Sequence, residues 1–483
     1  MELDPISLLI QTKSTLENQT SNVETYGYIL SQLGALVAQS SASEQARLSL
    51  VSNPKVSAIL SEIVEPCKFE NFDEYKLRIF RGCILLIRNL GSTGILAKSR
   101  YIHNLLSSFS QLIVSVEASP IRAQLIVSYV EALANIGVNA DKISVDLKLV
   151  TNMLESVSYE ADEEPIKLPV AIFLNNFFNS ENLFKLLNEK SSSYIIMKWL
   201  VRKFEEMDTD NELDPSENIL LEFAQNVISH ESYNKWLHRA YEQSETTFTF
   251  SQIMKFNQII VTSKEEWDSF QSAAILAWAF DFFKVFATLT EEILPKPIQE
   301  IDRDQLEIIH SNLISILDCI SDMGKLNSTR QFLEHYNAME ELIKLLRVVH
   351  ENVERKTLKK VEEVSKDELS RKAKRFPQIK SLIIEIISFM CHDSFSMQEK
   401  VREYHGLELV LSNCMIDDND PYIKERAIIC IKILLDKNSK NQQFVADLEA
   451  EQTVNDEALR EVGYEVEIDN GQVKLRKSEK QGN

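Results

Sequence analysis

Glycine and proline are scarce in this chain, which has only 11 of each among 483 residues. Both residues mark tight turns and interrupt helices, so their scarcity favours long helices joined by short turns. It argues against a β-sandwich and against a dinucleotide-binding sheet. Hydrophobic residues make up 44% of the chain and charged residues 26%, which is ordinary for a protein with a buried core.

Paired cysteines, a signal sequence and an uninterrupted apolar run are also missing. Five of the six cysteines lie inside or beside apolar stretches, where a free thiol behaves as a small hydrophobic group. We therefore expect reduced cysteines and a cytoplasmic protein. The opening stretch MELDPISLLIQTKS has no signal-peptide pattern. The most apolar run, 273–289, contains Asp281 and Lys284, so we expect no membrane insertion.

Positive charge is under-represented. The formal net charge is −21, and the isoelectric point is near 5.0. A surface of this sign repels phosphate backbones, so we expect no nucleic-acid binding. It sets no such limit on protein partners, which we expect this chain to bind.

The apolar residues that are present recur three and four positions apart, which is the spacing of helices. The stretches EYKLRIFRGCILLIRNLG (74–91) and IRAQLIVSYVEALANIGV (121–138) both show this pattern. The alternation typical of strands is nearly absent before the last thirty residues. The sequence therefore predicts an all-α protein.

Several predicted helices end in similar phrases. LIRNLGS contains Asn89, ALANIGV contains Asn135 and FLNNFFNS contains Asn176, at spacings of 46 and 41 residues. A period in the low forties is typical of armadillo and HEAT repeats, whose units must stack because one unit cannot cover its own apolar face. We predict an armadillo/HEAT-like α-solenoid of stacked helices over residues 1–350, with no clean phase between 180 and 310.

Two segments break the repeat pattern, and two more follow the repeat array. Residues 204–217 carry seven acidic residues and no basic one, which predicts a solvated loop. Residues 351–375 are highly charged with mixed sign, which is typical of a linker or an exposed helix. We expect residues 376–450 to form a further helical domain. In the tail, 451–483, alternation on both sides of Asn470-Gly471 predicts a short β-hairpin.

The stretch NCMIDDNDPYIKERAIICIKILL (413–435) poses the question of whether its acids perform chemistry. Pro421 is suited to the first position of a helix, and Asp420 to its N-cap. Asp417 and Asp418 would then lie beside the positive end of the helix dipole. This interpretation explains each acid without a metal or a proton-transfer role. An apolar stripe follows at helical spacing: Ile423, Ala427, Cys430, Ile431 and Leu434.

The candidate partner-binding residues are Asn89, Asn135 and Asn176. In armadillo-type units, an asparagine on the last helix lines the concave groove and hydrogen-bonds an extended peptide. At a helix end, the same side chain also satisfies a nearby backbone group. The sequence leaves both interpretations open.

Catalytic and metal-binding motifs are not recognisable. An EF-hand starting at Asp208 would place Leu213 at the position that needs glycine and Ile219 at the position that needs glutamate. The soft-metal ligand types Met390, Cys391, His392, Met397, His405 and Cys414 lie near one another in sequence, but the first two continue an apolar helix. Zinc-site spacings, a phosphate loop and a nucleophile elbow are not found. We predict a protein that is not an enzyme and has no cofactor or metal site.

Residues 376–449 resemble one family. The blocks that carry the resemblance are FPQIKSLIIEIISFMC, MQEKVREYHGLELVLSNC, IDDNDPYIKERAI and NSKNQQFV, followed by VGYEVE at 462–467. In this order they are similar to the ataxin-10 domain, and the fungal members, which also carry the name copper transport protein 86, are the most similar. The chain departs from the family pattern at Ser388, Phe389 and Arg426.

The resemblance implies an armadillo-like, mainly cytoplasmic protein that acts through protein contacts. Family members are linked to regulation of cytokinesis and can self-associate, so a homo-oligomer is one implied state. The leading hypothesis is a non-enzymatic helical-repeat scaffold. The alternatives are a soluble copper-homeostasis factor and a dedicated chaperone or assembly factor for one client protein.

Overall fold

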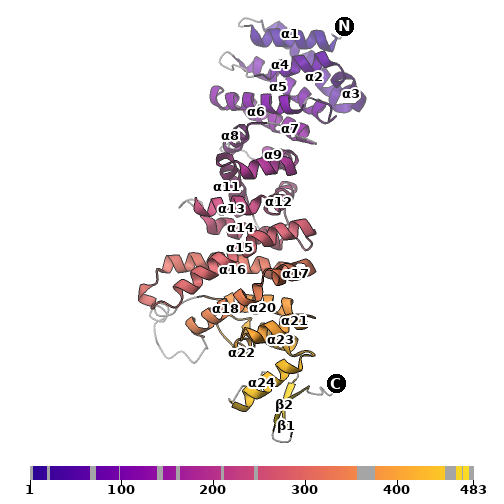
Figure 1. Ribbon diagram of the computed structural model, residues 1–483. Coiled ribbons are helices and arrows are strands. Elements are labelled where there is room, and N and C mark those ends of the chain that lie inside the picture. The colour runs from indigo at the N-terminus through magenta and orange to yellow at the C-terminus, as the bar shows by residue number, and fades with distance from the viewer. Residues whose placement is uncertain are drawn as a thin grey trace. The chain divides into compact units, whose positions relative to one another are not determined.

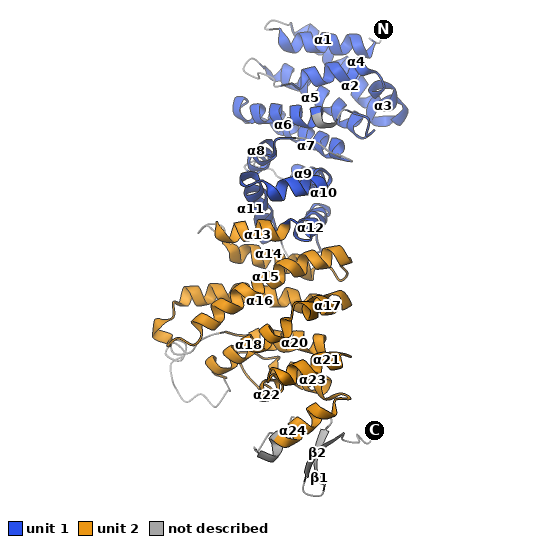
Figure 2. Ribbon diagram, viewed as in Figure 1, with its two compact units in different colours: residues 1–232 blue, residues 233–483 orange. Residues whose placement is uncertain are grey.

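The computed structural model describes residues 4–18, 22–65, 72–96, 98–138, 145–158, 164–207, 212–243, 249–355, 376–451, 464–469 and 472–477. Helices dominate these residues, so the all-α prediction is confirmed. The chain forms two compact units, residues 1–232 and residues 233–483 (Figure 2).

The first unit is a stack of helices in two layers (Figure 1). In one layer α2, α5, α7, α9 and α12 pack each against the next, and in the other α1, α4, α6, α8 and α11 do the same. The bounds are α1 Pro5–Glu17, α2 Val23–Ala42, α3 Glu44–Val51, α4 Pro54–Ile63, α5 Glu74–Gly91, α6 Lys98–Ser115, α7 Pro120–Gly137, α8 Leu147–Val157, α9 Glu164–Phe177, α10 Ser180–Asn188, α11 Ser191–Glu206 and α12 Pro215–Ile228.

The second unit also stacks its helices in rows. One row is α14, α16, α20 and α23, and behind it lie α15, α18 and α22. The bounds are α13 Tyr233–Glu242, α14 Phe250–Thr262, α15 Ser269–Ile293, the short 3₁₀ helix η2 Ile298–Glu300, α16 Arg303–Met323, α17 Asn327–His335, α18 Ala338–Asn352, α20 Ile379–Cys391, α21 Phe395–Glu403, α22 Leu407–Ser412, α23 Ile423–Leu435 and α24 Ser439–Glu451.

The asparagine spacing that predicted a repeat corresponds to real stacking. The helices α5, α7 and α9 end at Gly91, Gly137 and Phe177, and they are neighbours in one row. Close approach at one of these ends depends on glycine. A Cβ at Gly91 would lie 2.7 Å from Ile136 Cγ1, whereas one at Gly137 would lie at an ordinary contact distance, 3.5 Å from Asn176 Cβ. A larger residue at Gly91 would therefore push α5 away from α7.

The acidic stretch 204–217 is a loop only in part, which corrects the prediction. Its first residues belong to α11, which runs to Glu206, and its last residues begin α12. Asp214 Oδ1 accepts hydrogen bonds from the Ser216 and Glu217 amides, and the Glu217 side chain bonds back to the Asp214 amide. This reciprocal capping box explains why acids gather before α12.

The helix α15 is the longest apolar helix in the described part of the chain. Its 25 residues extend beyond the run 273–289, and by length and composition it is the one described helix that could cross a membrane. Core helices of soluble proteins meet the same criteria. Here α15 packs against α13, α16, α17 and α18, and it buries Trp278, Phe282 and Phe283 completely.

The strands β1, Tyr464–Asp469, and β2, Gln472–Lys477, pair antiparallel at the C-terminal end. The Asn470-Gly471 dipeptide that we predicted as their turn lies outside the described residues, so the hairpin stays a prediction. Residues 356–375, most of the predicted charged linker, also lie outside them.

Candidate functional site

The acidic turn before α23 does not cap that helix, so this prediction is wrong. The helix starts at Ile423 without a side-chain cap. Instead, Asp420 Oδ2 accepts a hydrogen bond of 2.9 Å from the Ser381 amide in the first turn of α20. The residue before α20, Gln378, provides no side-chain cap of its own. Asp420 is 1% exposed, so it caps a different helix from within the core.

Asp417 likewise faces α20. Its Oδ2 lies 3.0 Å from Lys380 Nζ, and the two side chains are 2% and 6% exposed. Its Oδ1 accepts from the Asn419 amide at 3.0 Å. A buried ion pair adds little net stability, but loss of one partner leaves an uncompensated buried charge. The predicted apolar stripe behind the turn is confirmed, since its members are buried: Ile423, Ala427, Cys430, Ile431 and Leu434.

Burial controls the titration of this cluster. It raises the pKa of the Asp420 carboxyl, while the hydrogen bonds from Ser381 oppose that rise. It also lowers the pKa of His350, and the nearby Lys380 ammonium lowers it further. His350 Nδ1 lies 3.4 Å from Asn413 Nδ2. Both shifts disfavour additional charge next to the Lys380–Asp417 pair.

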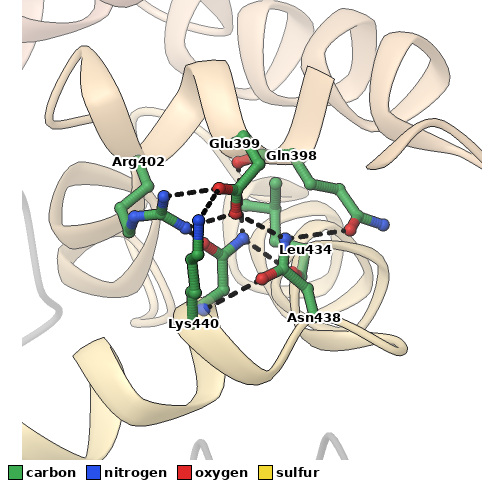
Figure 3. Close-up of polar contacts among 7 residues, drawn as sticks. Gln398, Glu399, Arg402, Leu434, Asn438 and Lys440 are labelled. Atoms are coloured by element: carbon green, nitrogen blue, oxygen red, sulfur yellow. Dashed lines mark hydrogen bonds and ion pairs between the residues drawn. The ribbon is translucent and has the colours of Figure 1, made fainter. Parts of the chain in front are cut away.

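A second polar cluster joins α21 to the turn between α23 and α24 (Figure 3). Arg402 Nη1 and Nη2 donate to Glu399 Oε1 and Oε2 at 2.5 and 2.7 Å. Lys440 Nζ reaches the same carboxylate at 3.1 Å, and Asn438 Nδ2 reaches it at 3.3 Å. These donors, with Arg402 the strongest, lower the pKa of Glu399 to about 2.

Buried side-chain amides add further hydrogen bonds to this polar cluster. Asn438 Oδ1 accepts from the Asn441 amide at 3.1 Å and so caps α24. Asn441 Nδ2 donates to Leu434 O at 2.9 Å and to Gln398 O at 3.3 Å. Gln398 Nε2 donates to Ile433 O at 2.9 Å. Because the two asparagines are fully buried and bonded to three segments, they fix the direction in which the chain leaves α23.

The outer face of α23 carries an exposed stripe, defined here as Tyr422, Arg426 and Ile429. Tyr422 is 62% exposed and Ile429 is 55% exposed. Arg426 lies between them, with its guanidinium 5.9 Å from the Tyr422 ring and 3.0 Å from Glu385 Oε2. Glu385 also accepts from Ser321 Oγ at 2.8 Å. The stripe therefore continues a polar face that crosses α16, α20 and α23.

Two of the three predicted asparagines make internal bonds. Asn89 Nδ2 donates to Val37 O at 3.1 Å and to a hydroxyl of α2, while Asn89 Oδ1 accepts from Arg88. Asn135 Nδ2 donates to Arg88 O at 3.0 Å. Asn176 is half-buried, and among the described residues its side chain has no hydrogen-bond partner. These contacts support the backbone-satisfying interpretation for the first two, whereas partner contact by the set stays a prediction.

Three of the six soft-metal ligand types lie around one cavity. Met390, His392 and Met397 line a cavity of about 500 Å³ beside α17. Cys391 is fully buried and does not line this cavity, and burial raises the pKa of its thiol. Burial likewise raises the pKa of Cys430 to about 12. Within the described ranges, three or more His, Cys, Asp or Glu side chains do not gather in a metal-binding arrangement.

The fold and these contacts define a helical-repeat protein whose last helices are joined by buried polar clusters. A family model, the spinocerebellar ataxia type 10 protein domain, matches residues 379–476. The ataxin-10 homolog of Debaryomyces hansenii is 46% identical over 480 residues, covering 97% of this chain and 96% of that protein. The ataxin-10 homolog of Candida albicans is 30% identical and covers 99% of each. Ataxin-10 of Macaca fascicularis is 30% identical over 163 residues, 32% of this chain and 33% of its own length.

This chain belongs to the ataxin-10 family, which confirms the resemblance found in the sequence. The block NSKNQQFV contributed to that resemblance, but nothing in it indicated that Asn438 and Asn441 bond to α21. The spacing of Glu399 and Arg402, three residues apart, was a signal for an ion pair that the sequence reasoning missed.

Proposed function

We propose that this protein is a non-enzymatic scaffold that binds other proteins in the cytoplasm and takes part in the regulation of cytokinesis. The link to cytokinesis rests on the family relation. The observation that carries the scaffold proposal is the stripe on α23, because Tyr422 and Ile429 expose more than half of their side-chain surface within the family-matched region.

The chemistry of the stripe suits a protein contact. Tyrosine and arginine are enriched among interface residues that contribute most to binding energy. Arg426 is already held by Glu385 and by the Tyr422 ring, so binding would lose less side-chain entropy than it would with a free arginine.

Affinity capture from native cells, with quantitative mass spectrometry, tests the proposal. The Tyr422→Ser/Ile429→Ser double variant should lose at least one stoichiometric protein that the wild type retains. The control is Phe270→Ser on α15, because this side chain is 87% exposed but lies outside the family-matched region. Identical partner sets for all three proteins, with unchanged thermal unfolding, would overturn the proposal.

The copper alternative has one observation in its favour, the cavity lined by Met390, His392 and Met397. Thioether and imidazole are suitable Cu(I) ligands. Metal-free protein titrated with Cu(I) in competition with a chelator should then bind one equivalent, and a His392→Ala/Met397→Leu variant should bind none. Failure of the wild type to hold copper against the chelator would rule this alternative out.

A further inference from the structure

Residues 74–130 carry an excess of positive charge within an acidic chain. This range contains seven Lys and Arg residues and two Glu residues, whereas the whole chain has 52 basic and 73 acidic residues. It covers α5, α6 and the first half of α7, and α7 contacts both of the other helices. A local field of this sign attracts carboxylates.

Three arginines lie on one face of α5, since Arg78, Arg81 and Arg88 are spaced by nearly whole helical turns. Arg78 is exposed and pairs with Glu74 one turn earlier, with 2.6 Å between Nη2 and Oε1. Arg88 Nη1 lies 2.7 Å from Glu131 Oε2 on α7. We call these three residues the α5 arginine face.

Arg81 differs from its neighbours because no carboxylate among the described residues pairs with it. Its Nε donates to Gln124 O at 3.4 Å and to Ser128 Oγ at 3.2 Å, both on α7. The two terminal nitrogens make no hydrogen bond within the described part of the chain. The guanidinium is therefore held at Nε, while Nη1 and Nη2 remain available. These two nitrogens can bind one carboxylate through two parallel hydrogen bonds.

We propose that the α5 arginine face binds an acidic segment of a partner protein, with one carboxylate on Arg81. The distance along α5 from Arg78 to Arg88 is about 15 Å, which an extended chain covers with about five residues. The ligand is thus a short run rich in Asp or Glu. An extended phosphate strand would meet the same arginines, so its binding is a separate outcome of the test below.

This proposal rests on the scaffold function but can fail separately from it, because the α5 arginine face lies in the first unit and the α23 stripe in the second. The loss of a partner from the Tyr422→Ser/Ile429→Ser variant would leave the arginine face untested. The loss of acidic-peptide binding would leave the α23 stripe unaffected.

The test measures the binding of end-blocked, fluorescein-labelled octaglutamate to the full chain by fluorescence anisotropy. Arg81→Gln should weaken binding about fivefold or more, as expected for the loss of one charge-assisted contact. Arg81→Lys should restore part of it, because lysine keeps the charge without the fork. Raising the salt from about 50 to about 200 mM should weaken wild-type binding.

Two further variants separate recognition from folding. Glu131→Gln should strengthen peptide binding, because it removes the carboxylate that now occupies Arg88. Arg100→Gln is the matched control, since Arg100 is a 56% exposed arginine that pairs with Glu65 away from the α5 face. It should bind the peptide as the wild type does.

Several results would overturn the proposal: no saturable binding by the wild type, an equal loss in Arg100→Gln, or no gain in Glu131→Gln. Displacement of the peptide by a lower concentration of octathymidylate would assign the face to nucleic acid instead. If Arg81→Gln fails to fold, the exposed Arg78→Gln variant and Glu131→Gln decide the question.

Discussion

Replacing Asp417 with alanine should strongly destabilise the second unit. The substitution removes the partner of Lys380 while both positions remain buried. Breaking a buried pair in this way costs about 3–5 kcal/mol, because the remaining charge has no water and no counterion. The Asn419 amide also loses its acceptor, which adds about 1 kcal/mol. We expect a total loss of about 4 kcal/mol or more.

Hydrogen exchange of the α20 amides during native-state opening, together with urea unfolding, measures this loss. The Lys380→Met/Asp417→Leu double variant should recover most of the stability, since apolar pairs of similar volume commonly replace buried ion pairs without cost. Asp418→Asn is the matched control, because Asp418 lies in the same turn but is exposed. Its stability should change by no more than about 0.5 kcal/mol.

A loss below about 1 kcal/mol in Asp417→Ala would show that Lys380 reaches water or another partner. A double variant as unstable as the single variant would show that the turn needs the carboxylate for its own geometry. Either result would refute the reasoning from the buried pair.

Three more predictions concern the same helices. The pKa of Glu399 is lowered from its ordinary 4.5 to about 2. The ionised carboxylate should therefore stabilise the fold fully above pH 4.5, and this stabilisation should disappear as the pH falls towards 2. In acid unfolding, the Glu399→Gln variant should lack this loss of stability between pH 4.5 and 2. The pKa of Asp420 is raised, so its effect on stability is opposite to that of Glu399: ionisation of Asp420 lowers stability as the pH rises through the folded-state pKa. Asp420→Asn should keep the bond from Ser381 and remain within about 1 kcal/mol of the wild type at neutral pH, whereas Asp420→Ala should lose about 1–2 kcal/mol in urea unfolding. Leu407→Asp or Ile431→Asp should abolish the cooperative thermal unfolding of the second unit, because both side chains are at most 1% exposed; a wild-type melting temperature would mean that the wrong face was placed inside.

Local patterns in the sequence predicted the helices and the fact that they stack. The spacing of apolar residues indicated which side of α23 is buried, from Ile423 to Leu434, because helical geometry alone places those side chains together. The Asn89-to-Asn135 spacing likewise marked equivalent positions on stacked helices, since Asn135 bonds to α5 as Asn89 bonds to α2.

The polar contacts could not be predicted in the same way. A cap motif is recognised by its distance in sequence from the helix it caps, and Asp420 satisfied that rule for α23. Its actual partner, Ser381, is 39 residues earlier. Similarly, Asn441 bonds to Gln398, 43 residues away. Such pairs form only where tertiary packing brings helices that are distant in sequence next to each other.

The sequence by itself determined that this protein is all-α, that its helices stack and that it belongs to the ataxin-10 family, because apolar periodicity and ordered blocks are properties of the chain alone. Only the tertiary structure decided that Asp417 and Asp420 bind α20, which amides hold α24 and which arginine on α5 has no carboxylate partner among the described residues. A hydrogen bond or ion pair forms where donors and acceptors meet within about 3 Å, and long-range packing, not sequence spacing, brings these groups together.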